Sequence, residues 1–118
     1  MQTWELRSTN GQAITLSIDT LDIERIFSGS CLDWVEINDG SSIQRYCGPW
    51  EDGNYYNDHG DNLGSSIPGP FTSTATIEVK FRSDYTETRS GFLAVICCSA
   101  HVTTLTSGEL INTLHYSD

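Results

Sequence analysis

Residues 72–82 read TSTATIEVKFR, and this stretch is the clearest indication of the fold class. From residue 77 to residue 82 apolar and charged side chains alternate at every position. A period of two places one set of side chains on each face of a β-strand. We therefore predict a strand over residues 72–82 that packs its apolar face on a core and turns its charged face to solvent.

The rest of the chain carries similar strand patterns and almost no helix signal. Residues 4–8, 13–18 and 33–37 alternate in the same way. Residues 92–98 are apolar on both faces, which predicts a central strand that is buried on both sides. The Asn10-Gly11 pair favours a hairpin between the first two strands, because both residues tolerate positive φ. Many short strands separated by turn signals indicate an all-β sandwich or barrel.

Composition limits both the size of the protein and its partners. A chain of 118 residues corresponds to about one domain, and a hydrophobic fraction of 37% is too high for a disordered chain. The net charge of −10 argues against nucleic acid and anionic membrane surfaces, and no apolar run is long enough for membrane insertion. This charge favours divalent cations and basic partners. The sequence contains neither a G-x-S-x-G nor an H-E-x-x-H motif, so we expect no enzymatic activity.

Two segments outside these strands also have a pattern. Residues 48–70 are rich in Gly, Asp, Asn and Pro, and we predict an ordered surface loop that Trp50, Tyr55 and Tyr56 anchor. Residues 101–106 alternate weakly, and residues 109–116 fit a further strand.

Five blocks of sequence then suggest a family. They are LDIE at 21–24, Cys31 followed by DWVEINDG at 33–40, YCG at 46–48, FRSDYT at 81–86 and GFLA at 91–94. In this order and spacing they resemble the CUB domain over about residues 4–97. The resemblance implies a jelly-roll-like antiparallel β-sandwich of two sheets for residues 1–98. It also implies a secreted, non-enzymatic protein-binding module, as found in complement and developmental proteases, receptors and extracellular matrix proteins.

The resemblance further implies a Ca²⁺ site. In the calcium-binding CUB domains one Glu and two Asp coordinate the ion, and the matching residues here are Glu24, Asp33 and Asp84. The matching main-chain carbonyl belongs to Thr86, and Glu87 stands where an Asn often contributes. Hard carboxylate and carbonyl oxygens are the ligands that Ca²⁺ prefers, and three clustered carboxylates would repel one another without a cation.

The same site implies a mode of partner recognition. In the family, carboxylates fixed by the metal accept a Lys or Arg side chain of another extracellular protein. The matching acceptors are Glu24 and Asp84, with Tyr85 beside them. We therefore expect calcium-dependent binding of a partner that presents a basic side chain.

The four cysteines have separate expectations. Cys31 and Cys47 match a family disulfide, whose loop would contribute roughly 3 kcal/mol of stability. Cys97 and Cys98 point to opposite faces if they lie in a strand. One of them is then a buried thiol, and the other is a free thiol or forms an interchain bond; a bond between the two is a further alternative.

The C-terminal segment, residues 99–118, has several interpretations. The usual opening of a CUB domain is missing before Trp4, yet residues 108–116, GELINTLHY, resemble that opening. One interpretation is that the segment opens a following repeat. A second is that it forms an extra strand, which fills the vacant sheet edge of its own chain or of a neighbouring chain. A third is that it is a disordered tail. Strand exchange between copies would produce head-to-tail oligomers. A structural, self-assembling subunit is therefore the alternative function, and a glycan-binding CUB domain is a weaker third.

Overall fold

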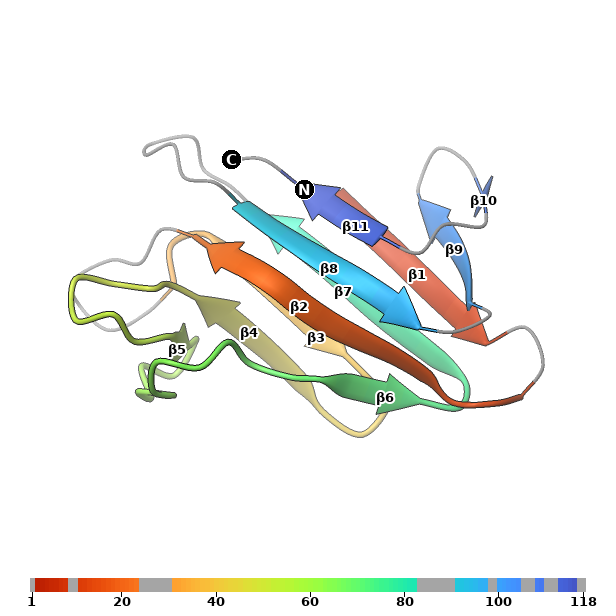
Figure 1. Ribbon diagram of the computed structural model, residues 1–118, viewed down its shortest axis with the longest axis horizontal. Coiled ribbons are helices and arrows are strands. Elements are labelled where there is room, and N and C mark those ends of the chain that lie inside the picture. Colours follow the sequence, from red (N-terminus) through yellow and green to blue (C-terminus); the bar gives the residue numbers. More distant parts are fainter. Residues whose placement is uncertain are drawn as a thin grey trace.

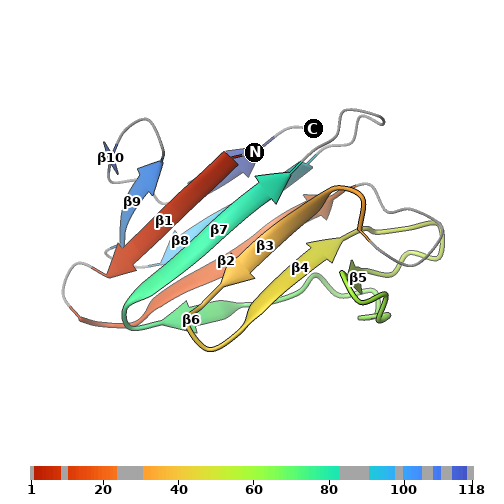
Figure 2. The same cartoon turned by 180° about the vertical axis from the view of Figure 1, so that it is seen from behind.

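The computed structural model of the protein describes residues 2–8, 11–23, 31–82, 91–97, 100–104, 108–109 and 113–116. Its described residues form strands and turns, and none of them is helical. The strands pack as two layers, with β2, β6, β8 and β11 in front in Figure 1 and β1, β3, β4 and β7 in front in Figure 2. The all-β, two-sheet sandwich that the sequence predicts is confirmed.

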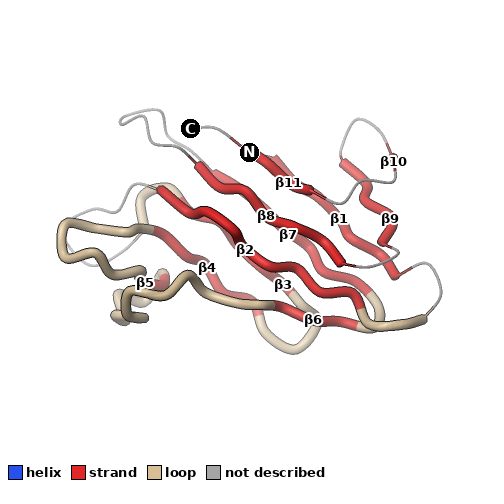
Figure 3. The backbone as a smooth tube through the Cα atoms, in the orientation of Figure 1, coloured by secondary structure: helices blue, strands red, loops and turns tan. Residues whose placement is uncertain are grey.

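All strand pairings within the two sheets are antiparallel. One sheet has seven strands in the order β10-β9-β1-β7-β3-β4-β5, and the other has four in the order β11-β8-β2-β6. The strands are β1 (Gln2–Ser8), β2 (Ile14–Asp22), β3 (Trp34–Asn38), β4 (Ile43–Cys47), β5 (Tyr56–Asn57), β6 (Phe71–Ser73), β7 (Thr76–Arg82), β8 (Gly91–Cys97), β9 (Ala100–Thr104), β10 (Gly108–Glu109) and β11 (Thr113–Tyr116). Figure 3 shows how much of the described chain these strands occupy.

Two local predictions are wrong for the same reason. The expected hairpin around Gly11 does not form, because β1 and β2 lie in different sheets. The expected single strand over residues 72–82 is divided into β6 and β7, which also lie in different sheets, with Thr74 and Ala75 as an exposed bend between them. In each pair the two strands face one another across the same interior, so the chain crosses between the layers at both points.

The core lies between the two sheets and is built from the alternating residues that the sequence predicts. Along β7 the side chains of Ile77, Val79 and Phe81 are buried, while the charged residues between them face outward. The largest side chains with almost no exposed surface are Phe81, Phe92, Leu6, Ile14, Leu16, Ile23, Ile77, Val35 and Val79. The aromatic rings join the layers, because Phe92 of one sheet contacts Trp4 and Phe81 of the other.

A β-bulge in β2 keeps its apolar residues on the core side. The pairing with β8 shifts between Ile18 and Thr20. Asp19 and Thr20 are both exposed, and the buried positions change from even numbers up to Ile18 to odd numbers at Leu21 and Ile23. An extra residue in one strand restores the inward direction after the bulge. The bulge thus allows β2 to run the length of the sandwich.

Strand β8 is central in its sheet but is buried on one face only. Phe92, Ala94 and Ile96 are buried, whereas Val95 is 46% exposed and Cys97 is also exposed. The prediction that residues 92–98 are covered on both faces is therefore wrong for the described part of this strand. In the single chain nothing among the described residues covers the outward face of β8.

The C-terminal strands extend both layers. β9 pairs with β1 in the seven-stranded sheet, and β10 pairs with β9. β11 pairs with β8 in the four-stranded sheet, with Leu114 opposite Ala94. The expected strand over residues 109–116 is therefore divided between the two sheets.

A candidate metal and partner-binding end of the sandwich

One end of the sandwich brings together strand ends that are distant in the sequence. At this end β3 begins opposite the end of β7, with Trp34 paired to Arg82, and β2 ends opposite the start of β8, with Asp22 paired to Gly91. Two backbone hydrogen bonds of 2.8 and 2.9 Å between Ile23 and Gly48 join the layers there. We call this region the disulfide end, since the Cys31–Cys47 bond lies in it.

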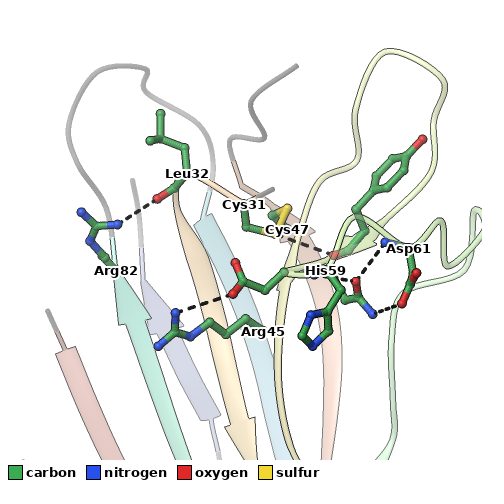
Figure 4. The surroundings of a disulfide bond; sticks show 10 residues. Cys31, Leu32, Arg45, Cys47, His59, Asp61 and Arg82 are labelled. Atoms are coloured by element: carbon green, nitrogen blue, oxygen red, sulfur yellow. Dashed lines mark hydrogen bonds and ion pairs between the residues drawn. A yellow bond between two sulfur atoms is a disulfide. The ribbon is translucent and has the colours of Figure 1, made fainter. Parts of the chain in front are cut away.

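The disulfide fixes the approach to β3. Cys31 and Cys47 are bonded, with their Cα atoms 5.7 Å apart, which confirms the expected pairing. Both residues are buried. Cys31 Sγ also lies 3.9 Å from the carbonyl oxygen of Tyr56, as Figure 4 shows. The bond therefore links the start of β3, the end of β4 and the following loop.

Asp33 lies between the disulfide and β3, and its side chain has no exposed surface. A buried carboxylate is costly unless a cation or hydrogen-bond donors compensate its charge. The segment around it is held from the neighbouring strand, because the Arg82 guanidinium donates a hydrogen bond of 3.3 Å to the carbonyl of Leu32 (Figure 4). Asp33 is thus a carboxylate fixed in place at the disulfide end.

The other predicted ligand and partner residues lie outside the described residues. These are Glu24, Asp84, Tyr85, Thr86 and Glu87. The described chain reaches Ile23, next to Glu24 in the sequence, and Arg82, two residues before Asp84. Within the described chain, no group of three or more His, Cys, Asp or Glu residues is arranged to hold a metal ion. Asp33 is therefore the one predicted ligand whose position the structure gives.

The loop over residues 48–70 borders the disulfide end and is anchored as predicted. Tyr55 and Tyr56 are each only 7% exposed, and Trp50 packs against the core. The Tyr55 hydroxyl donates a hydrogen bond to the carbonyl of Leu21, and the Tyr56 hydroxyl donates one to Asp52. Burial, with a smaller effect from the nearby charge of Asp22, raises the pKa of Tyr55. Tyr55 therefore stays neutral and can serve as a donor across the physiological range.

Asn57 organises the tip of this loop. Its side-chain oxygen accepts hydrogen bonds from the backbone N–H groups of His59 (2.9 Å) and Asp61 (3.0 Å), and its amide donates to Asp61 Oδ2 at 2.9 Å (Figure 4). The sequence signal is the Asn-Asp-His-Gly turn, because Asn side chains bond to the backbone two residues ahead. The buried Asn57 thus shapes the turn internally.

Gly48 allows the loop to start beside the layer junction. Its φ of +110° lies in the region that favours glycine, and a Cβ at this position would come within 3.1 Å of the Asn54 carbonyl oxygen. Both conditions exclude an ordinary side chain. The YCG block of the sequence, residues 46–48, therefore combines a disulfide cysteine with a glycine that the local backbone requires.

Cys97 is disulfide-bonded, and Cys98 lies outside the described residues. None of the described cysteines is a free thiol.

The family is identified by comparison with known proteins. The family described as CUB domain matches residues 2–95, which is most of the chain. This chain belongs to the CUB domain family. No match was found among the curated proteins or among the solved structures. CUB domains are generally non-enzymatic modules that bind other proteins, and they occur mostly in extracellular proteins. In the described part of this CUB domain, no helix has the length and hydropathy needed to cross a bilayer.

Proposed function

We propose that this CUB domain is an extracellular calcium-dependent binding module. One Ca²⁺ binds at the disulfide end through Glu24, Asp33, Asp84, the carbonyl of Thr86 and Glu87. The observation that carries this proposal is the complete burial of the Asp33 carboxylate beside the Cys31–Cys47 bond.

Burial supports a metal role for a physical reason. An ionised carboxylate loses its hydration inside a protein, and a divalent cation with further oxygen ligands is among the strongest compensations. Asp33 is also held in place by its neighbours, since the disulfide precedes it and β3 follows it. A ligand that is fixed before the ion arrives loses little conformational entropy when the ion binds.

The partner in this proposal presents a Lys or Arg side chain. Glu24 and Asp84, oriented by the metal and flanked by Tyr85, accept that side chain by charge-assisted hydrogen bonds. The net charge of −10 supports a basic partner, because a strongly acidic protein attracts cations over long range.

Calcium binding is tested by thermal melts with Ca²⁺, with Mg²⁺ and with a chelator. Binding at about 100 times the Kd adds about 2.7 kcal/mol of stability, so the wild type should melt roughly ten degrees higher in Ca²⁺. The Asp84→Asn variant should lose this shift. Asp19→Asn is the matched control, because Asp19 is an exposed acid on β2 and the change in charge is the same. A wild-type melt that does not respond to Ca²⁺ would overturn the proposal.

Partner recognition is tested with a hexalysine peptide at constant ionic strength. Ca²⁺ lowers the negative charge of the protein, so non-specific attraction to the peptide must weaken when the metal binds. The proposed site predicts the opposite, a calcium-dependent gain in affinity that Asp84→Asn abolishes. Binding that is stronger in chelator than in Ca²⁺ would show charge attraction alone and refute this mode of recognition.

A second candidate function is structural self-assembly by strand exchange. The pairing of β11 with β8 and of β9 with β1 supports it, because the C-terminal segment already adds strands to both sheets of its own chain. The same segment added to a neighbour would form a head-to-tail chain. Size-exclusion chromatography tests this function: oligomers should disappear when residues 99–118 are deleted, and oligomers that persist would exclude it.

A further inference from the structure

The outward faces of the two sheets differ sharply in charge. The seven-stranded sheet carries charged side chains that form ion pairs across its outward face, including Arg45–Glu36 and Lys80–Glu78. On the four-stranded sheet the middle of the outward face has no charged side chain among the described residues. On β2, β6 and β8 it consists of Thr15, Ser17, Thr72, Leu93, Val95 and Cys97, which we call the neutral face.

The neutral face has an apolar centre. Leu93, Val95 and Cys97 form a continuous line along β8, and Val95 is 46% exposed. Hydroxyl groups lie beside this line, because Ser17 pairs with Val95 and Thr15 pairs with Cys97. In a strand with one solvated face, apolar residues that point to the core normally alternate with polar or charged residues that point to water. Strand β8 instead carries apolar residues on both sides. Such a strand is typical of a sheet that is covered on both faces, so the open side indicates an interface.

We propose that the neutral face is the contact surface between two copies of this chain. The two copies pack their four-stranded sheets against each other around a two-fold axis, so each neutral face meets the other. The contact is independent of calcium and lies on a different surface from the disulfide end.

The charge distribution favours a second copy over a basic partner. Each copy carries a net charge of −10, so two copies repel wherever their acidic surfaces meet. The neutral face is a surface on which two identical chains can approach without placing like charges in contact. A basic partner would gain little there, because the nearest described carboxylates, Asp19 and Asp22, lie towards the end of β2, where Thr20 pairs with Leu93.

The size of the face sets the strength of the contact. The four strands contain nine, three, seven and four residues. At about 3.3 Å per residue and about 4.8 Å between strands, the flat area of the whole four-stranded sheet is roughly 400 Å² in each copy, and the neutral face is part of it. This is below the area of a stable, permanent interface. We therefore expect a weak dimer that forms at high concentration, or where many copies are held close together.

Sedimentation velocity from micromolar to millimolar protein tests the proposal on the full chain. We expect a reversible monomer–dimer equilibrium that is the same in Ca²⁺ and in chelator. The dimer should strengthen with salt, because the Debye length falls from about 30 Å at 0.01 M to about 3 Å at 1 M and screens the repulsion. A monomer at millimolar concentration in high salt would overturn the proposal.

The Val95→Lys variant locates the contact. It makes the net charge less negative, which weakens the overall repulsion, yet it places an unpaired charge in the centre of the face. We expect the dimer Kd to rise at least about tenfold. The Ile43→Lys variant is the matched control, because Ile43 is a 59% exposed aliphatic residue on β4 of the other sheet and the charge change is identical. It should leave the dimer intact or strengthen it slightly.

A second variant and a deletion complete the test. Ser17→Lys places the same charge opposite Val95 and should weaken the dimer in the same way. If both variants leave the Kd unchanged while deletion of residues 99–118 abolishes association, the contact is strand exchange and the neutral-face proposal is wrong.

Discussion

The guanidinium carbon of Arg45 lies 4.2 Å from the ring centroid of Trp34. Val35 points into the core, so the preceding Trp34 points to the outward face of β3. The Trp34 side chain is nevertheless only 5% exposed. Arg45 contributes to this covering from β4 while its Nε donates to Glu36 at 3.0 Å and its Nη1 lies 3.8 Å from Asp58. One side chain therefore connects β3, β4 and the loop beside the disulfide end.

Replacing this arginine should destabilise the domain and expose the tryptophan. We expect Arg45→Ala to cost about 1–2 kcal/mol, from the lost ring contact and the partly buried Glu36 partner. Arg45→Lys should recover only part of the loss, since an ammonium lacks the planar fork. Urea unfolding and acrylamide quenching of tryptophan fluorescence measure both effects. Arg7→Ala is the control, because Arg7 is 67% exposed and its ion pair is with Glu5, two residues away, so it should change stability by less than about 0.5 kcal/mol.

The aromatic contacts between the sheets give a second prediction. Phe92 stands edge-on to Trp4 with ring centroids 5.5 Å apart, and it is 1% exposed. Phe92→Ala should cost about 3–5 kcal/mol, because the cavity would open between the layers. Phe71→Ala removes the same atoms from a partly buried edge position and should cost clearly less. Equal losses in denaturant unfolding would show that Phe92 does not join the layers as described.

The Cys31–Cys47 bond gives a third prediction, which concerns the denatured chain. The two residues are 16 apart in sequence, so the bond should contribute roughly 3 kcal/mol by restricting the unfolded state. The Cys31→Ala, Cys47→Ala double variant should therefore melt roughly ten degrees lower. If its melt matches that of the wild type, the loop-entropy account fails for this bond.

The turn between β3 and β4 gives a prediction of pH dependence. The Asp39 carboxylate accepts hydrogen bonds from the N–H groups of Ser41 (2.9 Å) and Ser42 (3.0 Å), and these donors hold its pKa below the usual 3.8. A lowered pKa in the folded state adds stability that is present above pH 3.8 and is lost as pH falls through the folded pKa. Asp39→Ala should thus cost up to about 1 kcal/mol at neutral pH, and this difference should shrink below about pH 4.

The Asp39→Asn variant separates charge from hydrogen bonding at this turn. It keeps an acceptor oxygen for Ser41 and Ser42 but cannot titrate. We expect it to keep part of the stability at neutral pH and to lose the acid-dependent change relative to wild type. Chemical unfolding at a series of pH values provides the comparison, and a parallel acid dependence in wild type and Asp39→Asn would contradict the role of this carboxylate.

The local elements follow from the sequence because their causes are local. Alternation fixes which side of each strand is apolar, and it correctly predicts the buried faces of β1, β3 and β7. The turn at Asp39-Gly40 follows from residue types that accept positive φ or bond to the backbone, and Gly40 has a φ of +94°. The CUB blocks add the Cys31–Cys47 pairing, which spacing by itself left open among three connectivities.

The candidate site was only partly accessible to such reasoning. The resemblance selects Asp33 as a ligand, and the structure adds that its side chain is wholly buried. Sequence patterns missed Arg45, because its role depends on partners that come from another strand and from a loop. In the sequence Arg45 carries no pattern of its own, and only the fold brings Trp34 and Asp58 beside it.

The sequence by itself determined the apolar faces of β1, β3 and β7, the all-β class and the family of this protein. Tertiary structure alone decided which strands share a sheet: it separated β1 from β2 and β6 from β7, and it left Val95 and Cys97 of β8 exposed. The physical reason is that alternation records only which face of a strand is apolar. Two successive apolar faces can be buried side by side in one sheet or face to face in two. The choice depends on how all the strands together enclose one core, and no single segment contains that information.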